Sequence, residues 1–253
     1  MSRVVGIISG KGGVGKTTLT ANLSVALASK FSKKVTVVDC NLTTSHLGMH
    51  FGIFFYPKTF NDFLKGVAEI NDVIFPHGTG VNILPASLNV SDLVGINIFE
   101  IREKLQSLPE NDFILLDTAP GFGKEALSAI RACNEALLIT TPDLPSVTDV
   151  LKAKNILNQM NVSINGVVVN KVMGKKFELS VSEIEETLEL PIIGKIPFTP
   201  EFSESLSNKT PLVAYNEYSK ASREIFKIAA YMANEHYKEP PMLRIFLSRI
   251  FKV

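Results

Sequence analysis

Gly10-Lys11-Gly12-Gly13-Val14-Gly15-Lys16-Thr17 has the pattern of a phosphate-binding loop, in which a glycine and four further residues precede Gly-Lys-Thr. An apolar run at residues 4–8 comes before this stretch and predicts a buried strand. Residues 17–30 follow it, and their leucines and alanines recur at helical spacing without glycine or proline. Strand, glycine-rich turn and helix therefore occur in the order that such a loop requires.

This loop has the chemistry to bind the phosphates of a nucleotide. Its glycines let successive backbone N–H groups point inward, where a side chain would block the phosphates, and the helix N-terminus adds its dipole. We expect Lys16 to neutralise the β- and γ-phosphates and the Thr17 hydroxyl to bind Mg²⁺. A glycine-rich turn without a ligand is the alternative, although two lysine-glycine units would be unusual there. The predicted nucleotide-binding residues of the loop are Gly10, Lys11, Gly12, Gly13, Val14, Gly15, Lys16, Thr17 and Thr18.

Strand-like and helix-like segments alternate along the rest of the chain. Short runs rich in Val, Ile and Leu predict strands buried on both faces at residues 35–39, 81–84, 113–117, 136–140, 166–170 and 192–196. Helical patterns occur at residues 100–108, 123–132, 146–160, 182–188 and 217–234. This alternation predicts an α/β fold, with a mostly parallel twisted sheet and helices on both faces, as in P-loop NTPases. Ligands of such sheets bind at the carboxyl ends of the strands.

Length and composition favour one large domain at residues 1–238, followed by a short tail at 239–253. The 253-residue chain is 45% hydrophobic, and its formal net charge of +1 gives no overall attraction to nucleic acid or membrane. Cys40 and Cys133 lack the spacing of a metal site or a disulfide framework, so we expect a reduced, cytoplasmic compartment. Neither a signal peptide nor a membrane span is expected. The four histidines also lack ligand spacing and are expected to be surface or structural residues.

Acidic residues close two of the predicted strands. Asp117 ends one of them, where a carboxylate can hold the hydration shell of Mg²⁺ opposite Thr17. By the same argument, Asp39 lies near the metal or its waters. Taken alone, Asp117 could equally be a solvated or capping residue. Pro120 and Gly121 follow it and predict a loop that changes conformation near a γ-phosphate.

Together these segments resemble the MinD/ParA ATPases, whose Walker A motif has an additional lysine. The resemblance extends to about residue 236 and is closer to the MinD branch than to the DNA-segregating ParA branch. It rests on GKGGVGKTT, the Asp39 loop, Asp117-Thr118-Ala119-Pro120 and Thr141-Pro142-Asp143 with Ser146-Val147.

The resemblance implies an ATPase that forms a face-to-face homodimer around two ATP molecules, with Mg²⁺ as the metal. Lys11 would reach across the interface to the phosphates bound by the other subunit. A mobile ammonium can stabilise negative charge there, much as an arginine finger does. A solvated loop lysine is the alternative.

Asn41 departs from the family, whose members commonly have Asp-x-Asp in this loop. The second Asp is assigned to positioning the attacking water, whereas an amide orients water through its oxygen but cannot act as a base. We therefore expect slow hydrolysis and a long-lived ATP dimer. The predicted catalytic residues are Lys11, Lys16, Asp39, Asn41 and Asp117, and the predicted metal-site residues are Thr17, Asp39 and Asp117.

The resemblance also implies an adenine site. Asn170 ends a predicted strand where family members place an asparagine against the base, and its carboxamide offers both donors and acceptors. Pro197 and Phe198 belong to a loop similar to the one whose backbone contacts the adenine edge. As alternatives, Asn170 caps a turn and the prolines end a strand.

The tail has an apolar and a basic side. Pro240-Pro241 is expected to break the preceding helix. Beyond it, helical spacing gathers Leu243, Phe246, Leu247, Ile250 and Phe251 on one side and Arg244, Ser248 and Lys252 on the other. We predict that this segment lies in a membrane interface with its cations at anionic headgroups, and it resembles the tail of MinD proteins. A helix docked on the chain's own core is the alternative.

The favoured function is an ATP-dependent switch that associates with the inner face of the cell membrane and positions a protein partner or responds to a protein activator. A ParA-type DNA-segregating ATPase is an alternative, but binding nucleic acid would need a basic surface. A metal or Fe–S carrier would need differently spaced cysteines. An ATP-locked scaffold is a further alternative, and it would differ from the switch in its rate of ATP turnover. The aromatic segment 51–60 is either core or part of a partner surface.

Overall fold

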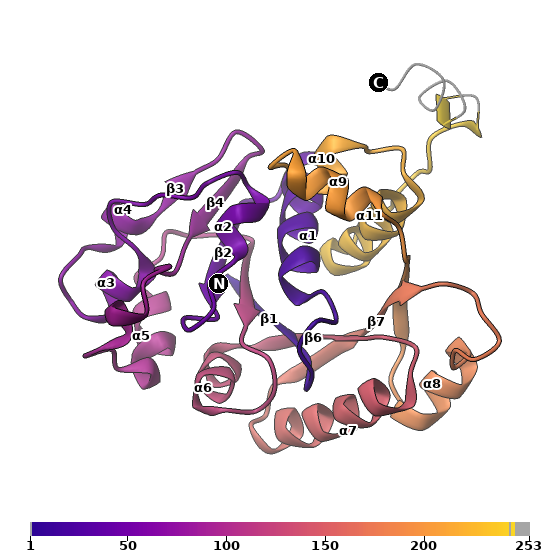
Figure 1. The fold of residues 1–253 in the computed structure, drawn as a ribbon, viewed down its shortest axis with the longest axis horizontal. Helices are drawn as coiled ribbons and strands as arrows, with labels where there is room; N and C mark the ends of the chain where they lie inside the picture. The colour runs from indigo at the N-terminus through magenta and orange to yellow at the C-terminus, as the bar shows by residue number, and fades with distance from the viewer. Residues whose placement is uncertain (1, 243, 246–253) are drawn as a thin grey trace.

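The computed structural model describes residues 2–242, 244 and 245. Its centre is an eight-stranded sheet in the order β3-β4-β2-β5-β1-β6-β7-β8, and all neighbouring strands are parallel except β3 and β4 (Figure 1). The predicted α/β fold with a mostly parallel sheet is therefore confirmed. The strands are β1 (Arg3–Ile8), β2 (Val35–Cys40), β3 (Phe75–Pro76), β4 (Val81–Leu84), β5 (Phe113–Thr118), β6 (Glu135–Thr140), β7 (Ser163–Val172) and β8 (Ile192–Pro197).

Helices cover both faces of the sheet (Figure 1). One face carries two long helices packed against each other and three short ones, α1 (Lys16–Phe31), α11 (Lys220–Ala233), α2 (Leu47–His50), α9 (Glu201–Ser207) and α10 (Leu212–Tyr215). The other face is covered by α3 (Phe60–Leu64), α4 (Ile70–Val73), α5 (Ile101–Leu105), α6 (Lys124–Ala132), α7 (Leu144–Gln159) and α8 (Val181–Leu188). Of two 3₁₀ turns, η1 (Val90–Leu93) packs beside α3, and η2 (Ile98–Glu100) packs beside α5 and α6.

Alternating side chains explain why the sheet needs cover on both faces. In β2, Val37 belongs to the core beneath α1 and α11, whereas Val38 belongs to the core on the opposite face, and both are fully buried. Leu115 and Leu116 of β5 divide in the same way. A short, continuous apolar run is therefore buried on both sides.

The helices differ from the predicted ones in their ends and in number. The helix predicted at 100–108 is shorter in the structure, where it corresponds to α5. The prediction that Pro240-Pro241 breaks the last long helix is wrong, because α11 already ends at Ala233, where Asn234 turns left-handed (φ 53°). Helices α2, α3, α4, α9 and α10 were not predicted, because four to seven residues are too few for a periodic pattern.

The aromatic segment at 51–60 divides between core and surface. Phe51 and Phe60 are buried, whereas Phe54 and Phe55 are 49% and 81% exposed. The segment is therefore core at Phe51 and Phe60, and a partner surface at Phe54 and Phe55 stays a prediction.

The start of the tail contacts the domain. The Glu239 carboxylate forms ion pairs with Arg223 (2.7 Å) and Lys227 (2.6 Å) of α11. Ile245 is buried and Arg244 is exposed. The other predicted membrane-contacting residues lie outside the described residues, namely Leu243, Phe246, Leu247, Ile250, Phe251 and Lys252. Within residues 2–242, 244 and 245, no helix is long and apolar enough to cross a membrane.

Candidate functional site

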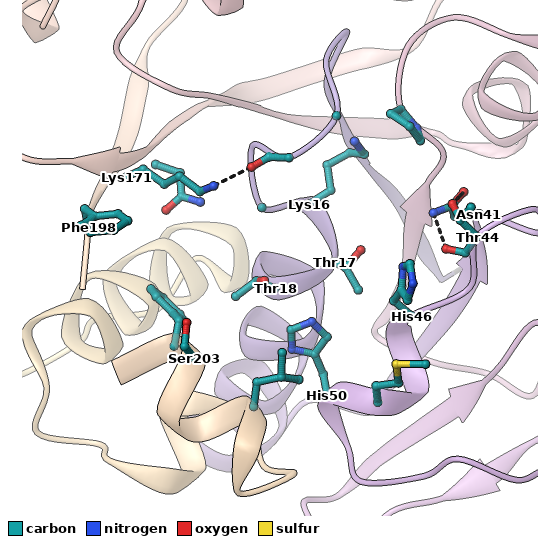
Figure 2. Close-up of a pocket in the computed structure, with 18 of the residues that line it drawn as sticks. Lys16, Thr17, Thr18, Asn41, Thr44, His46, His50, Lys171, Phe198 and Ser203 are labelled. Carbon is teal, nitrogen blue, oxygen red and sulfur yellow. Dashed lines mark hydrogen bonds between the residues drawn. The ribbon is translucent and has the colours of Figure 1, made fainter. Parts of the chain in front are cut away.

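A cavity of about 720 Å³ opens at the carboxyl ends of the central strands (Figure 2). This is the edge at which a parallel sheet binds its ligands. The phosphate loop and the predicted base site both contribute to its wall, so segments far apart in the sequence meet in one place. The predicted residues that line it are Gly12, Gly13, Gly15, Lys16, Thr17, Thr18, Asn41, Asn170, Pro197 and Phe198.

Glycines with positive φ shape the loop between β1 and α1. Gly13 (φ 78°) and Gly15 (φ 102°) occupy the left-handed region that favours glycine. A Cβ at Gly15 would also lie only 2.4 Å from Asn170 Nδ2. Helix α1 starts directly after Gly15 without a side-chain cap, so its first N–H groups are left for an anion.

Lys16 lies against the inside of this loop. Its side chain is largely buried, and its Nζ donates to Ser9 Oγ (3.1 Å) and to the Lys11 carbonyl (3.5 Å). Burial lowers the pKa of Lys16, and the nearby Asp117 carboxylate opposes that shift. Both present acceptors are uncharged oxygens, so phosphate oxygens would bind this ammonium more strongly.

Asp117, at the end of β5, has the properties of a metal-site carboxylate. It is 1% exposed, and neither oxygen accepts a hydrogen bond of good geometry from the described part of the chain. Burial, followed by the charge of Asp39, raises its pKa, and the hydroxyls of Thr17 and Thr20 with Lys16 only partly oppose this. A buried carboxylate without hydrogen bonds is costly. A divalent cation between Thr17 and Asp117 would satisfy it, so the residues present fit Mg²⁺.

Asp39 lies next to Asp117 in the sheet but has a different environment. The two residues are register partners on β2 and β5. The Asp39 carboxylate accepts hydrogen bonds from Ser45 Oγ (2.7 Å), Asn41 N (3.0 Å) and Leu47 N (3.3 Å). Burial raises its pKa, and these hydrogen bonds oppose the shift. Asp39 therefore holds the β2–α2 loop in shape, and its predicted contact with the waters of the metal stays a prediction.

Asn41 presents its carboxamide to the cavity in a fixed orientation. Its Nδ2 donates to the Thr44 carbonyl (2.7 Å), and its Oδ1 accepts from Thr44 Oγ1 (3.0 Å; Figure 2). The neighbouring Thr43 donates through its backbone N–H to Glu125 Oε1 of α6 (2.9 Å). The β2–α2 loop is thus linked to the helix that follows the Asp117 loop.

Lys11 is held by its own chain. Its Nζ lies 3.8 Å from Asp143 Oδ1 and 3.4 Å from Ser146 Oγ at the start of α7. Asp143 caps this helix by accepting from Ser146 N (3.0 Å). About half of the Lys11 side chain is exposed, so it has room to move. Its predicted role in a second subunit stays a prediction.

Asn170 closes the other end of the cavity against the phosphate loop. It is 7% exposed, and its Nδ2 donates to the Val14 carbonyl (2.7 Å). Because a carbonyl can only accept, this contact fixes the orientation of the amide and leaves Oδ1 for a ligand. Phe198, 61% exposed, and Pro197 line the same cavity, and the contact of these residues with adenine stays a prediction.

Further residues of the cavity wall were not predicted. They come mainly from α2, α9 and the end of β7 and comprise Thr44, His46, Met49, His50, Phe54, Lys171, Phe202, Ser203 and Leu206. His46 and His50 lie in the site rather than merely on the surface, and burial, with His46 nearby, lowers the pKa of His50 to about 4. The described residues contain no cluster of three or more His, Cys, Asp or Glu side chains suited to a metal ion. Cys40 and Cys133 are buried free thiols.

Comparison with known proteins agrees with this geometry. The model of the CobQ/CobB/MinD/ParA nucleotide binding domain matches residues 5–212. An uncharacterised ATP-binding protein of Methanocaldococcus jannaschii is 36% identical over 239 residues, covering 94% of this chain and 90% of that protein. The septum site-determining protein MinD of Pyrococcus horikoshii, solved with Mg-ADP, gives a TM-score of 0.88 at 32% identity, covering 92% and 96% of the two chains. A chain of the MinC:MinD cell division complex of Aquifex aeolicus gives a TM-score of 0.82 at 28% identity, covering 95% of this chain and 99% of that chain.

Proposed function

Because this chain belongs to the MinD/ParA family of nucleotide-binding proteins, we propose that it is an ATP-dependent dimerising switch that binds a membrane and positions a partner protein. The chain is a MinD-like ATPase, and its cofactors are ATP and Mg²⁺. The observation that carries the assignment of an ATP and Mg²⁺ site is the Asp117 carboxylate. It is buried without a well-oriented hydrogen bond, close to Thr17 and Lys16 of the phosphate loop.

The residues around the loop account for ATP binding and slow hydrolysis. Loop N–H groups and Lys16 bind the β- and γ-phosphates, while Thr17 and Asp117 hold Mg²⁺, which supplies charge neutralisation when bound. Asn41 orients the attacking water through Oδ1, whose position Thr44 fixes. An amide cannot take up the proton of this water. Turnover is therefore slow, and the ATP-bound state is long-lived.

Dimerisation would use the mobility of Lys11. In the single chain its ammonium is paired with one exposed carboxylate and one hydroxyl, which is a weak arrangement. The phosphates of an ATP molecule bound by a second copy offer a higher density of negative charge. Lys11 would leave Asp143 and Ser146 and bind across the interface, so that ATP joins the two copies.

Membrane binding would follow from dimerisation. The segment from Lys238 onward has four basic residues against one acidic residue, and the apolar side chains of the tail recur at helical spacing. A segment this short binds anionic headgroups weakly as a single copy, and two copies on one dimer gain avidity. The location at the inner face of the membrane is part of the same proposal.

A protein partner or activator completes the proposed switch. The MinC:MinD complex of Aquifex aeolicus supports this part, because one of its chains has the same fold as this protein over almost its whole length. An ATP-locked scaffold is the second candidate, favoured by Asn41 in place of an acid, and turnover of ATP separates the two. A DNA-binding role is less well supported by the net charge of +1.

Two measurements on purified protein test this proposal. Light scattering should show a dimer with ATP and a monomer with ADP, and Lys11→Ala should remain monomeric with ATP while still binding MgADP. Lys176→Ala, which removes an exposed lysine without a hydrogen bond or ion pair to any described residue, is the matched control.

The second measurement tests membrane binding. With ATP, the full chain should sediment together with phosphatidylglycerol vesicles, whereas a chain ending at Glu239, in which Glu239 keeps its ion pairs with Arg223 and Lys227, should not. Equal sedimentation with ATP, with ADP and after truncation would reject the membrane switch.

A further inference from the structure

The end of β7 contains an extra residue beside the phosphate loop. Val169 pairs with Lys195 and Val172 with Pro197, so three steps along β7 correspond to two along β8. Lys171 adopts φ 59°, a left-handed conformation that residues other than glycine rarely adopt. This is the geometry of a β-bulge, which changes the direction of side chains and occurs preferentially next to active sites.

The bulge directs two consecutive side chains to the same target. In a regular strand Asn170 and Lys171 would point to opposite faces. Here Asn170 Nδ2 donates to the Val14 carbonyl (2.7 Å), and Lys171 Nζ donates to the Gly13 carbonyl (2.7 Å; Figure 2). Two neighbouring residues of β7 therefore bind two neighbouring carbonyls of the phosphate loop.

These carbonyls belong to the peptide groups of the phosphate loop and point away from the anion site. A peptide group whose N–H points toward a phosphate has its C=O directed away, and that oxygen needs a donor of its own. Loop glycines alone leave several peptide orientations accessible. Holding Gly13 O and Val14 O in place therefore selects the orientation in which the N–H groups converge on the ligand.

We infer that Lys171 is a positioning residue for phosphate binding, which acts through the Gly13 carbonyl and is brought there by the β7 bulge. It touches the loop rather than the reacting atoms. Its charge also strengthens the hydrogen bond, because an ammonium donor binds a carbonyl more tightly than a neutral donor does. This inference rests on the nucleotide-binding part of the proposed function and is independent of dimerisation and membrane attachment.

Calorimetric titration of the full-length protein with three ligands tests this role. MgADP contains both parts of the nucleotide, Mg-tripolyphosphate contains only the phosphates, and adenosine contains only base and ribose. Lys171→Met should weaken MgADP and tripolyphosphate by about tenfold and leave adenosine unchanged, because one charge-assisted hydrogen bond to the loop is lost. Lys171→Arg should restore binding to within about threefold of wild type, since it too can donate to the carbonyl.

Lys176→Met is the matched control, because Lys176 is exposed on the same loop after β7. This variant should bind all three ligands as the wild-type protein does. Lys171 is itself exposed, so its truncation leaves the core intact, and a thermal melt without ligand verifies this. If Lys171→Met nevertheless fails to fold, Lys171→Gln replaces it in the same comparison. Unchanged MgADP affinity in the folded variant, or an equal loss for adenosine, would overturn the inference. A wild-type protein that binds no MgADP would instead reject the proposed function.

Discussion

Lys11 Nζ lies 3.8 Å from Asp143 Oδ1, so the lysine proposed to act in a second subunit is paired within its own chain. The pair joins the phosphate loop to the N-terminus of α7. Both side chains are close to half exposed, so the interaction is screened by solvent and contributes about 0–1 kcal/mol. It is strong enough to orient Lys11 and weak enough to be exchanged for phosphates.

Asp143→Asn should strengthen the ATP-dependent dimer. The substitution removes the charge that holds Lys11 but keeps an oxygen that can cap α7, because Asn is a good N-cap residue. We expect dimer affinity to rise by up to about 30-fold, because each of the two copies no longer has to break an exposed ion pair of up to about 1 kcal/mol. Mass photometry over a protein dilution series with ATP measures this, with ADP as control. A weaker dimer would mean that Asp143 itself contributes to the interface.

Asp117→Asn should stabilise the nucleotide-free protein as pH rises. Burial raises the pKa of Asp117 from 3.8 to about 8 in the folded protein, so the folded state favours the protonated acid. Its contribution to stability is fully present below about pH 4 and is lost as pH rises through about 8. Asn, which does not ionise, should therefore gain about 1–3 kcal/mol over wild type at alkaline pH and little at pH 4.

Urea unfolding at both pH values measures this difference. The same variant should lose the contribution of Mg²⁺ to nucleotide affinity, because an amide is a poorer ligand for this ion than a carboxylate. A stability difference that does not change with pH would contradict the assigned environment of Asp117.

Asn41→Asp should accelerate ATP hydrolysis. A carboxylate at this position can accept a proton from the attacking water, and we expect a rise in kcat of roughly tenfold or more. Folding stability should fall by about 0.5–1.5 kcal/mol, because the donor to the Thr44 carbonyl is lost. A steady-state phosphate-release assay measures turnover, and Asn41→Ala should lower it. Unchanged turnover in Asn41→Asp would show that water positioning does not depend on this residue.

Gly15→Ala should destabilise the folded protein by about 1–3 kcal/mol, because it forces a non-glycine residue into a left-handed conformation. Its Cβ would also lie 2.4 Å from Asn170 Nδ2. Gly12→Ala is the matched comparison, since its Cβ would approach Pro120 Cβ only to 3.7 Å. Thermal unfolding without ligand measures both variants. Equal melting temperatures would show that the loop does not need its observed backbone conformation.

Most of the sheet could be predicted from the sequence, because continuous apolar runs have few structural alternatives once both faces are buried. The environments of Asp39 and Asp117 could not be predicted from the sequence. Both end apolar strands, and only the fold of the β2–α2 loop brings Ser45 and Leu47 to one carboxylate and leaves the other without them. The bulge at Lys171 was equally hidden, since its register depends on pairing with β8.

The ion pairs of Glu239 with Arg223 and Lys227 fix where the tail begins on the domain. Helix α11 carries both cations and packs along α1, whose first residues form the phosphate site. Two helices packed against each other thus connect the phosphate site to the start of the tail. In the proposed switch, adhesion would then depend on how many tails are joined rather than on a change within one tail. At low concentration the bound amount would grow with the square of the protein concentration, which would give a protein layer on the membrane abrupt borders.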